Sequence, residues 1–183
     1  MAEQELVRDD APITASKTIK PDAALSAETV TIARPPDELF DFWRDVTNLP
    51  RVMENIERIE RIDERRSRWT VKAPGDQSVS WDSVITHEEP GRSISWQSAE
   101  GADIDNSGKI EFIDAGERGT VVRAVIAYKP PAGTAAKLVA KIFQREPRIQ
   151  SRRDLRRFKQ LMEAGEIATS ARNLRMFAAE KDQ

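Results

Sequence analysis

The segment from residue 130 to residue 163 constrains the fold most, because it is the one long stretch of this chain with sustained helical periodicity. Its first half carries apolar residues at helical spacing from Ala135 to Phe143, and its second half carries Leu155, Phe158 and Met162. A helix with one apolar side needs a partner surface, and the residues upstream have the pattern of strands. The sequence therefore predicts a curved antiparallel sheet that grips a C-terminal helix.

Pro147 divides this segment, since a proline lacks the backbone N–H that a helix interior requires. The apolar stripes on its two sides do not share one helix face at about 100° per residue. We therefore expect a long C-terminal helix that is broken near Glu146, with Pro147 in the first turn of the second part.

The upstream residues are predicted to form about seven strands and two short helices. Glu28–Arg34 alternates apolar and polar side chains, and turn signals between Ile56 and Tyr128 delimit about six further strands. Short turns between neighbouring strands imply an antiparallel meander. Pro36 is placed to open a helix whose apolar face includes Trp43, and a further helical turn follows it.

Period-two alternation assigns the side chains of these strands to two faces. The apolar face carries Trp69, Val71, Trp81, Ile85, Ile94, Trp96, Ile110, Phe112, Ala124, Ile126 and Tyr128. The opposite face carries Arg68, Lys72, Asp82, Glu111 and Arg123. The pattern therefore predicts an α+β fold in which one face of the sheet is covered and the other faces water.

Composition bounds the domain organisation. A chain of 183 residues is long enough for one domain with a sizeable core, which we assign to residues 27–165. Residues 1–26 are acidic and without periodicity, which predicts a disordered leader, and residues 166–183 are expected to form a mobile tail. The chain has no cysteine, which excludes disulfides, thiolate metal sites and cysteine nucleophiles, and the cytoplasm is the favoured location.

Patterns typical of catalysis or metal binding are scarce. The sole histidine, His87, lies in THEEP and is predicted to be an exposed residue at a strand end, which makes it a poor general base. The sequence has no nucleophile elbow, no metal-ligand cluster and no phosphate-binding glycine loop. We therefore predict no catalytic residue, no metal and no cofactor, and the formal net charge of -2 argues against nucleic-acid binding.

Six segments of the chain support a more specific comparison. They are RPPDELFDFWRDVTNLPRVMENIERIE, SRWTVKAP, SVSWDSVIT, SISWQS, NSGKIEF and EPRIQSRRDLRRFKQLME, in this order. Together they resemble the bacterial polyketide cyclase/dehydrase-like proteins, also grouped with coenzyme Q-binding START-like domains, of the START/Bet v 1-like (SRPBCC) superfamily. This resemblance extends over about three quarters of the chain and implies the helix-grip fold.

The resemblance also implies a hydrophobic cavity between the sheet and the C-terminal helix, suited to a lipid, quinone, sterol or polyketide-like aromatic. The residues expected to line it are Trp43, Trp69, Trp81, Trp96, Phe112, Ile126, Tyr128, Leu138, Ile142, Leu155 and Phe158. Aromatic walls with few polar groups are typical of ligand pockets. The same side chains could instead fill a core, and this alternative stays open.

A basic run accompanies the C-terminal helix, in which Arg152, Arg156 and Lys159 are expected to point toward solvent. Such a run is typical of a solvated helix face, and peripheral contact with an anionic membrane is the sharper hypothesis. The sequence favours binding or transport of a small hydrophobic ligand over catalysis. A polyketide cyclase, aromatase or dehydratase stays open as an alternative, as does a membrane-surface module without a ligand, and the oligomeric state is not indicated.

Overall fold

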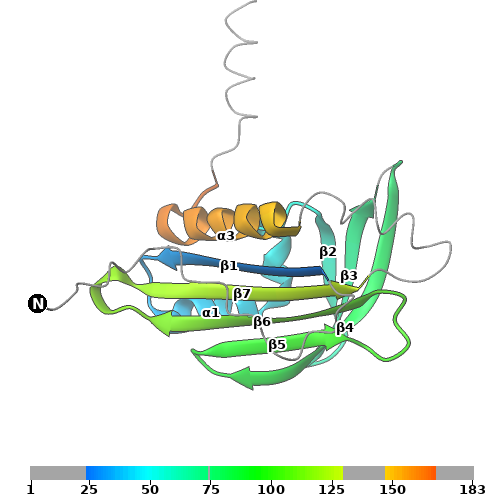
Figure 1. Cartoon of the computed structure of the whole chain (residues 1–183), viewed down its shortest axis with the longest axis horizontal. Helices are drawn as coiled ribbons and strands as arrows, with labels where there is room; N and C mark the ends of the chain where they lie inside the picture. The colour runs from blue at the N-terminus through cyan, green and yellow to red at the C-terminus, as the bar shows by residue number, and fades with distance from the viewer. Residues whose placement is uncertain (1–23, 74, 130–146, 168–183) are drawn as a thin grey trace, which may run out of the picture.

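The computed structural model describes residues 24–73, 75–129 and 147–167, which form one curved antiparallel sheet and its covering helices (Figure 1). The strands are β1 (Ala24–Ile32), β2 (Ile56–Arg61), β3 (Arg66–Ala73), β4 (Gln77–Glu89), β5 (Ser93–Ser98), β6 (Asp105–Asp114) and β7 (Thr120–Lys129). The helices are α1 (Pro36–Arg44), α3 (Pro147–Ala164) and the 3-10 turns η1 (Val46–Arg51) and η2 (Gly116–Arg118). The predicted α+β helix-grip architecture is confirmed.

The strand order is β1-β7-β6-β5-β4-β3-β2, so strands β2 to β7 form the predicted meander and β1 joins β7. The β1–β7 ladder runs from the pair Ala24 and Tyr128 to the pair Ile32 and Thr120. Gly119 has a φ of 91°, and a Cβ at this position would overlap the backbone around Ile32. A glycine is therefore required where the start of β7 meets the end of β1.

Local sequence signals accompany the start of helix α1 and the end of helix α3. Helix α1 has a proline in its first turn, followed by Asp37 and Glu38, which suit the positive end of the helix dipole. Helix α3 is described from Pro147 to Ala164 and is followed by Gly165, whose φ is 75° and whose N–H donates to the carbonyl of Leu161 at 2.9 Å.

Some boundaries differ from the sequence expectations. Strand β1 already includes Ala24, before the predicted start at Glu28, because its ladder with β7 contains residues that lack apolar alternation. The last residues of the predicted leader therefore belong to the sheet, and the rest of the leader lies outside the described residues. The first half of the predicted C-terminal helix, with Leu138 and Ile142, and residues 168–183 of the predicted tail also lie outside them.

Charged pairs cover the outer face of the sheet, as the alternation predicts. Arg68 donates to Asp82 across β3 and β4 at 2.7 Å, and Arg123 donates to Glu111 across β6 and β7 at 2.8 Å. These opposite charges lie on neighbouring strands, where cross-strand pairs stabilise a sheet. The outer face is thereby polar, and the apolar face is turned toward the helices.

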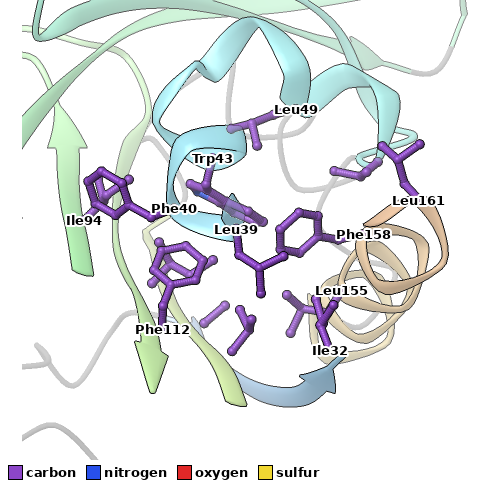
Figure 2. Close-up of a cluster of buried hydrophobic side chains, with 14 of the residues drawn as sticks. Ile32, Leu39, Phe40, Trp43, Leu49, Ile94, Phe112, Leu155, Phe158 and Leu161 are labelled. Carbon is purple, nitrogen blue, oxygen red and sulfur yellow. The ribbon is translucent and has the colours of Figure 1, made fainter. Parts of the chain in front are cut away.

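Most of the core lies between the sheet and helices α1 and α3 (Figure 2). Phe158 of α3 is fully buried and packs against Trp43 of α1, with ring centroids 5.3 Å apart at 71°. Phe40 of α1 packs against Phe112 of β6 with the same edge-to-face geometry, at 6.0 Å. A second, smaller cluster contains Val71, Trp81, Ile104 and Tyr128.

Candidate functional site

A cavity of about 150 Å³ lies between the inner face of the sheet and residues of α1, η1 and α3. Its wall draws on both core clusters and is mostly apolar. The described lining residues are Ser26, Trp43, Val46, Leu49, Met53, Asn55, Ile56, Ser67, Trp69, Val71, Trp81, Ser83, Ile85, Ile94, Trp96, Asn106, Ile126, Tyr128, Gln150, Ser151 and Asp154. All four tryptophans of the chain are among them.

The structure brings only part of the predicted site together. Six of the predicted residues are on the cavity wall, namely Trp43, Trp69, Trp81, Trp96, Ile126 and Tyr128. Phe112, Leu155 and Phe158 belong to the packed core cluster and are not among the described lining residues. These three side chains hold the helices on the sheet, and no ligand role follows for them from their position.

The tryptophans on the sheet form part of the wall because their strands place them on the inner face. Trp69 and Trp81 are a directly opposed pair on β3 and β4, and their rings stack with centroids 6.1 Å apart. Trp96 of β5 is opposed to Gly108 of β6, where a Cβ would overlap the indole ring. Gly108 therefore lets the Trp96 ring lie across the neighbouring strand.

Two indole N–H groups are satisfied by polar side chains that also line the cavity. Trp69 donates from Nε1 to Oγ of Ser67 at 2.9 Å, and Trp96 donates from Nε1 to Oδ1 of Asn106 at 3.1 Å. The buried Nε1 of Trp81 has no hydrogen-bond partner in the described part of the chain. Burial raises the pKa of Tyr128 to about 12, so its hydroxyl stays protonated at neutral pH.

Asp154 is a cavity residue that the sequence analysis did not single out. It lies on α3 one turn after Gln150, whose Nε2 donates to its Oδ1 at 2.8 Å. The pKa of Asp154 is raised to about 7, mainly by burial and also by the charge of Glu54, while the hydrogen bond from Gln150 and the charge of Arg157 oppose the rise. A carboxyl group in this state can hold or release a proton near neutral pH.

In the sequence, Asp154 stands among arginines, between Arg152–Arg153 and Arg156–Arg157, and nothing there marks it as a cavity residue. Its burial results from the chain between η1 and β2, which packs beside α3 more than 90 positions away in sequence, and the backbone N–H of Glu54 donates to its carboxylate. The spacing of Gln150 and Asp154 is a weak signal, because such pairs are common on exposed helices. Asn106 was likewise missed, since only the sheet register brings it beside Trp96.

The basic residues of α3 are largely engaged within the fold. Arg152 pairs with the buried Glu28 of β1 at 3.2 Å, and Arg157 pairs with Glu54 at 2.6 Å. Lys159, which is expected to point toward solvent, has a side chain that is 40% exposed, and its Nζ donates to the carbonyl of Thr31 at 2.7 Å and to Glu163. The free side of edge strand β1 supplies this carbonyl. Arg156 is exposed, as predicted.

Other candidate sites are absent from the parts of the chain that the structure describes. His87 is exposed next to an irregularity in the β4–β5 ladder and is not among the lining residues. The described residues contain no group of three or more histidine and acidic side chains that could hold a metal ion. In the same residues, no helix is both long and apolar enough to cross a membrane.

Solved structures share this architecture. A Deinococcus radiodurans protein, DR_A0006, is 40% identical, with a TM-score of 0.64, over 78% of this chain and 99% of that chain. An aromatase/cyclase from a Streptomyces species is 18% identical, with a TM-score of 0.61, over 79% of this chain and 99% of that chain. A Thermus thermophilus protein is 22% identical, with a TM-score of 0.60, over 75% of this chain and 95% of its own.

A family model decides the assignment. No curated protein matches the chain at a significant level. The family model described as polyketide cyclase/dehydrase and lipid transport matches residues 32–156, which is more than half of the chain. This range contains α1, the sheet from the end of β1 to β7 and the cavity-lining part of α3. The chain therefore belongs to the polyketide cyclase/dehydrase and lipid transport family.

Proposed function

We propose that the protein binds a small hydrophobic ligand in the cavity under α3. The observation that carries the proposal is the cavity itself, whose mostly apolar wall includes all four tryptophans of the chain. A packed core without a cavity would have served stability alone, since interiors otherwise reach the packing density of organic crystals. Aromatic walls of this kind favour planar and apolar ligands.

The volume of the cavity limits the size of the ligand that it can hold. A void of about 150 Å³ in another protein accepts benzene, whereas pockets for drug-sized ligands measure about 300–1,000 Å³. The described cavity therefore suits the ring system of a quinone, a polyketide-like aromatic or the ring end of a lipid. A long aliphatic chain would have to extend beyond it.

A cavity-filling substitution tests the proposal. Ile126 on β7 lines the cavity, so Ile126→Phe should occupy part of it and weaken ligand binding. Ile113 on β6 is 43% exposed on the other face, so Ile113→Phe is the matched control with the same change. Titration calorimetry with 1,4-naphthoquinone and with decanoic acid should show saturable binding to the parent and to Ile113→Phe for at least one compound. Absence of saturable binding of both to the parent would refute the proposal.

A second candidate function is acid–base catalysis in the same cavity, as expected of a cyclase or dehydratase. The observation that favours it is Asp154, a partly buried carboxyl group on the cavity wall whose raised pKa of about 7 suits proton transfer near neutral pH. A poly-β-ketone thioester incubated with the parent should then lose water, as followed by mass spectrometry. Asp154→Asn should abolish this loss, whereas the exposed control Asp103→Asn should keep it. Equal product from the parent and from Asp154→Asn would exclude this role.

The membrane-surface hypothesis has less support. A docking surface needs positive charge that is free to meet headgroups, and Arg152, Arg157 and Lys159 are engaged with β1, Glu54 and Glu163. We therefore propose ligand binding without a lasting membrane contact. The cytoplasmic location stays a prediction from the absence of cysteine.

A further inference from the structure

A row of polar side chains crosses the apolar inner face of the sheet at one level. Ser67 on β3 is directly opposed to Ser83 on β4, and Ser83 is opposed to Ser98 on β5. Oγ of Ser98 joins the row to β6 by donating to the carbonyl of Asn106 at 3.2 Å and accepting its N–H at 2.9 Å. Asn106 is opposed to Tyr128 on β7. Directly opposed residues share a face, so these five side chains form one polar row across five strands.

Apolar residues border the polar row on both sides. The opposed pair Trp69 and Trp81 lies two positions along the strands in one direction. In the other direction lie the directly opposed residues Trp96 on β5, Gly108 on β6 and Ile126 on β7. A ligand lying on this part of the inner sheet face would therefore place its rings against the indole groups and its polar atoms against the polar row.

Two residues of the polar row keep hydrogen-bond donors that can face a ligand, because the indole N–H groups beside them occupy only acceptor atoms. An indole nitrogen can only donate, so the atom of Asn106 that faces Trp96 at 3.1 Å must be its oxygen. The amide Nδ2 then points away from Trp96, and it has no acceptor among the described residues. Oγ of Ser67 likewise accepts from Trp69, so its own proton is left to donate.

The charge of the wall indicates which acceptor would meet these donors. Among the described lining residues, Asp154 is the one with an ionisable carboxyl group, and none is a lysine or an arginine. A carboxylate or phosphate on the ligand would thus find no positive partner on the described part of the wall, and burying an unpaired charge is costly. A neutral carbonyl oxygen accepts from amide and hydroxyl donors without this cost.

We propose that the polar row selects ring-containing ligands that carry a neutral carbonyl group, with Nδ2 of Asn106 and Oγ of Ser67 as the donors that recognise it. This inference rests on the proposed binding function and adds to it the chemical class of the ligand. Asn106 and Ser67 are then specificity-determining residues. Their orientation is fixed by Trp96 and Trp69, because an indole N–H can donate a hydrogen bond but cannot accept one.

The test compares two probes of nearly the same shape, 1-tetralone and tetralin, which differ by one carbonyl oxygen. Asn106→Asp keeps an acceptor for Trp96 and removes the amide donor, so it should weaken 1-tetralone binding about five- to tenfold and change tetralin binding less than twofold. Ser67→Ala should act in the same direction, and Ser80→Ala on the exposed face should change neither affinity. Dissociation constants come from titration calorimetry, with thermal unfolding of each variant as the folding control.

A measurement on the parent protein keeps the inference testable if a variant fails to fold. The infrared carbonyl stretch of bound 1-tetralone should lie below its frequency in cyclohexane, because a hydrogen bond weakens the C=O bond. An unshifted band, or equal losses for both probes in Asn106→Asp, would overturn the carbonyl selection and leave the binding function standing. Failure of both probes to bind the parent would overturn the inference together with ring-ligand binding.

Discussion

Truncation of Phe158 to alanine should remove the aromatic contact between α3 and α1. The Phe158 side chain is fully buried and meets the rings of Trp43 and Phe42 with centroids 5.3 and 5.1 Å away. A buried aromatic side chain covers roughly 150–250 Å², so loss of about 150 Å² at about 25 cal/mol per Å² costs about 4 kcal/mol. This value agrees with the cost of about 3–5 kcal/mol for such truncations in cores and is a large part of a typical domain stability.

Urea unfolding followed by tryptophan fluorescence measures this loss in the free energy of unfolding. Phe158→Leu keeps part of the contact and should lose about 1–2 kcal/mol, and Arg156→Ala on the exposed side of the same helix should change stability by less than about 0.5 kcal/mol. A loss below about 1 kcal/mol for Phe158→Ala, with an unchanged urea dependence, would refute the view that this ring holds α3 on the domain.

Three further predictions concern other contacts. Burial raises the pKa of Asp154 to about 7 from 3.8, so the folded chain keeps a proton that the unfolded chain releases, and the free energy of unfolding should fall as pH rises from about 4 to 7. Asp154→Asn should reduce this fall by on the order of a few kcal/mol. If urea unfolding gave the same pH dependence of the free energy of unfolding for Asp154→Asn as for the parent, the raised pKa of Asp154 would be contradicted. Arg152→Gln should cost about 1–2 kcal/mol because Glu28, 8% exposed, loses its ion pair with Arg152, whereas Arg156→Gln should leave the melting temperature within about a degree. Gly108→Ala should cost about 1–3 kcal/mol and change the fluorescence of Trp96, since the new Cβ overlaps its ring; a fully stable variant with parental fluorescence would disprove this contact.

The fold was predictable because its signals are local. Alternation in β3 to β7 assigned Trp69, Trp81 and Trp96 to one face, and Pro36 marked the start of α1. Such patterns need no knowledge of distant contacts. The early start of β1 was not predictable in this way, because pairing with β7 and not local alternation brings Ala24 into the sheet.

The polar part of the site was less predictable because it depends on tertiary contacts. The raised pKa of Asp154 requires burial beside the chain around Glu54, and the pairing of Arg152 with Glu28 spans 124 positions of sequence. The donor role of Asn106 requires the exact offset of β5 against β6, and a shift by one residue would reverse its face. Sequence patterns indicate which face is apolar, whereas the register decides which polar groups meet on it.

The central claim is that a ring-containing ligand occupies the cavity, and the indole N–H signals of the protein test it most directly. The chain has four tryptophans, and all four line the cavity. A two-dimensional ¹H–¹⁵N spectrum of labelled protein, recorded during titration with 1-tetralone, should show saturable shifts of these indole signals. Backbone signals of the outer-face residues Arg68 and Arg123 should stay in place. Shifts confined to surface residues, or indole signals that do not move at saturating 1-tetralone, would contradict the claim.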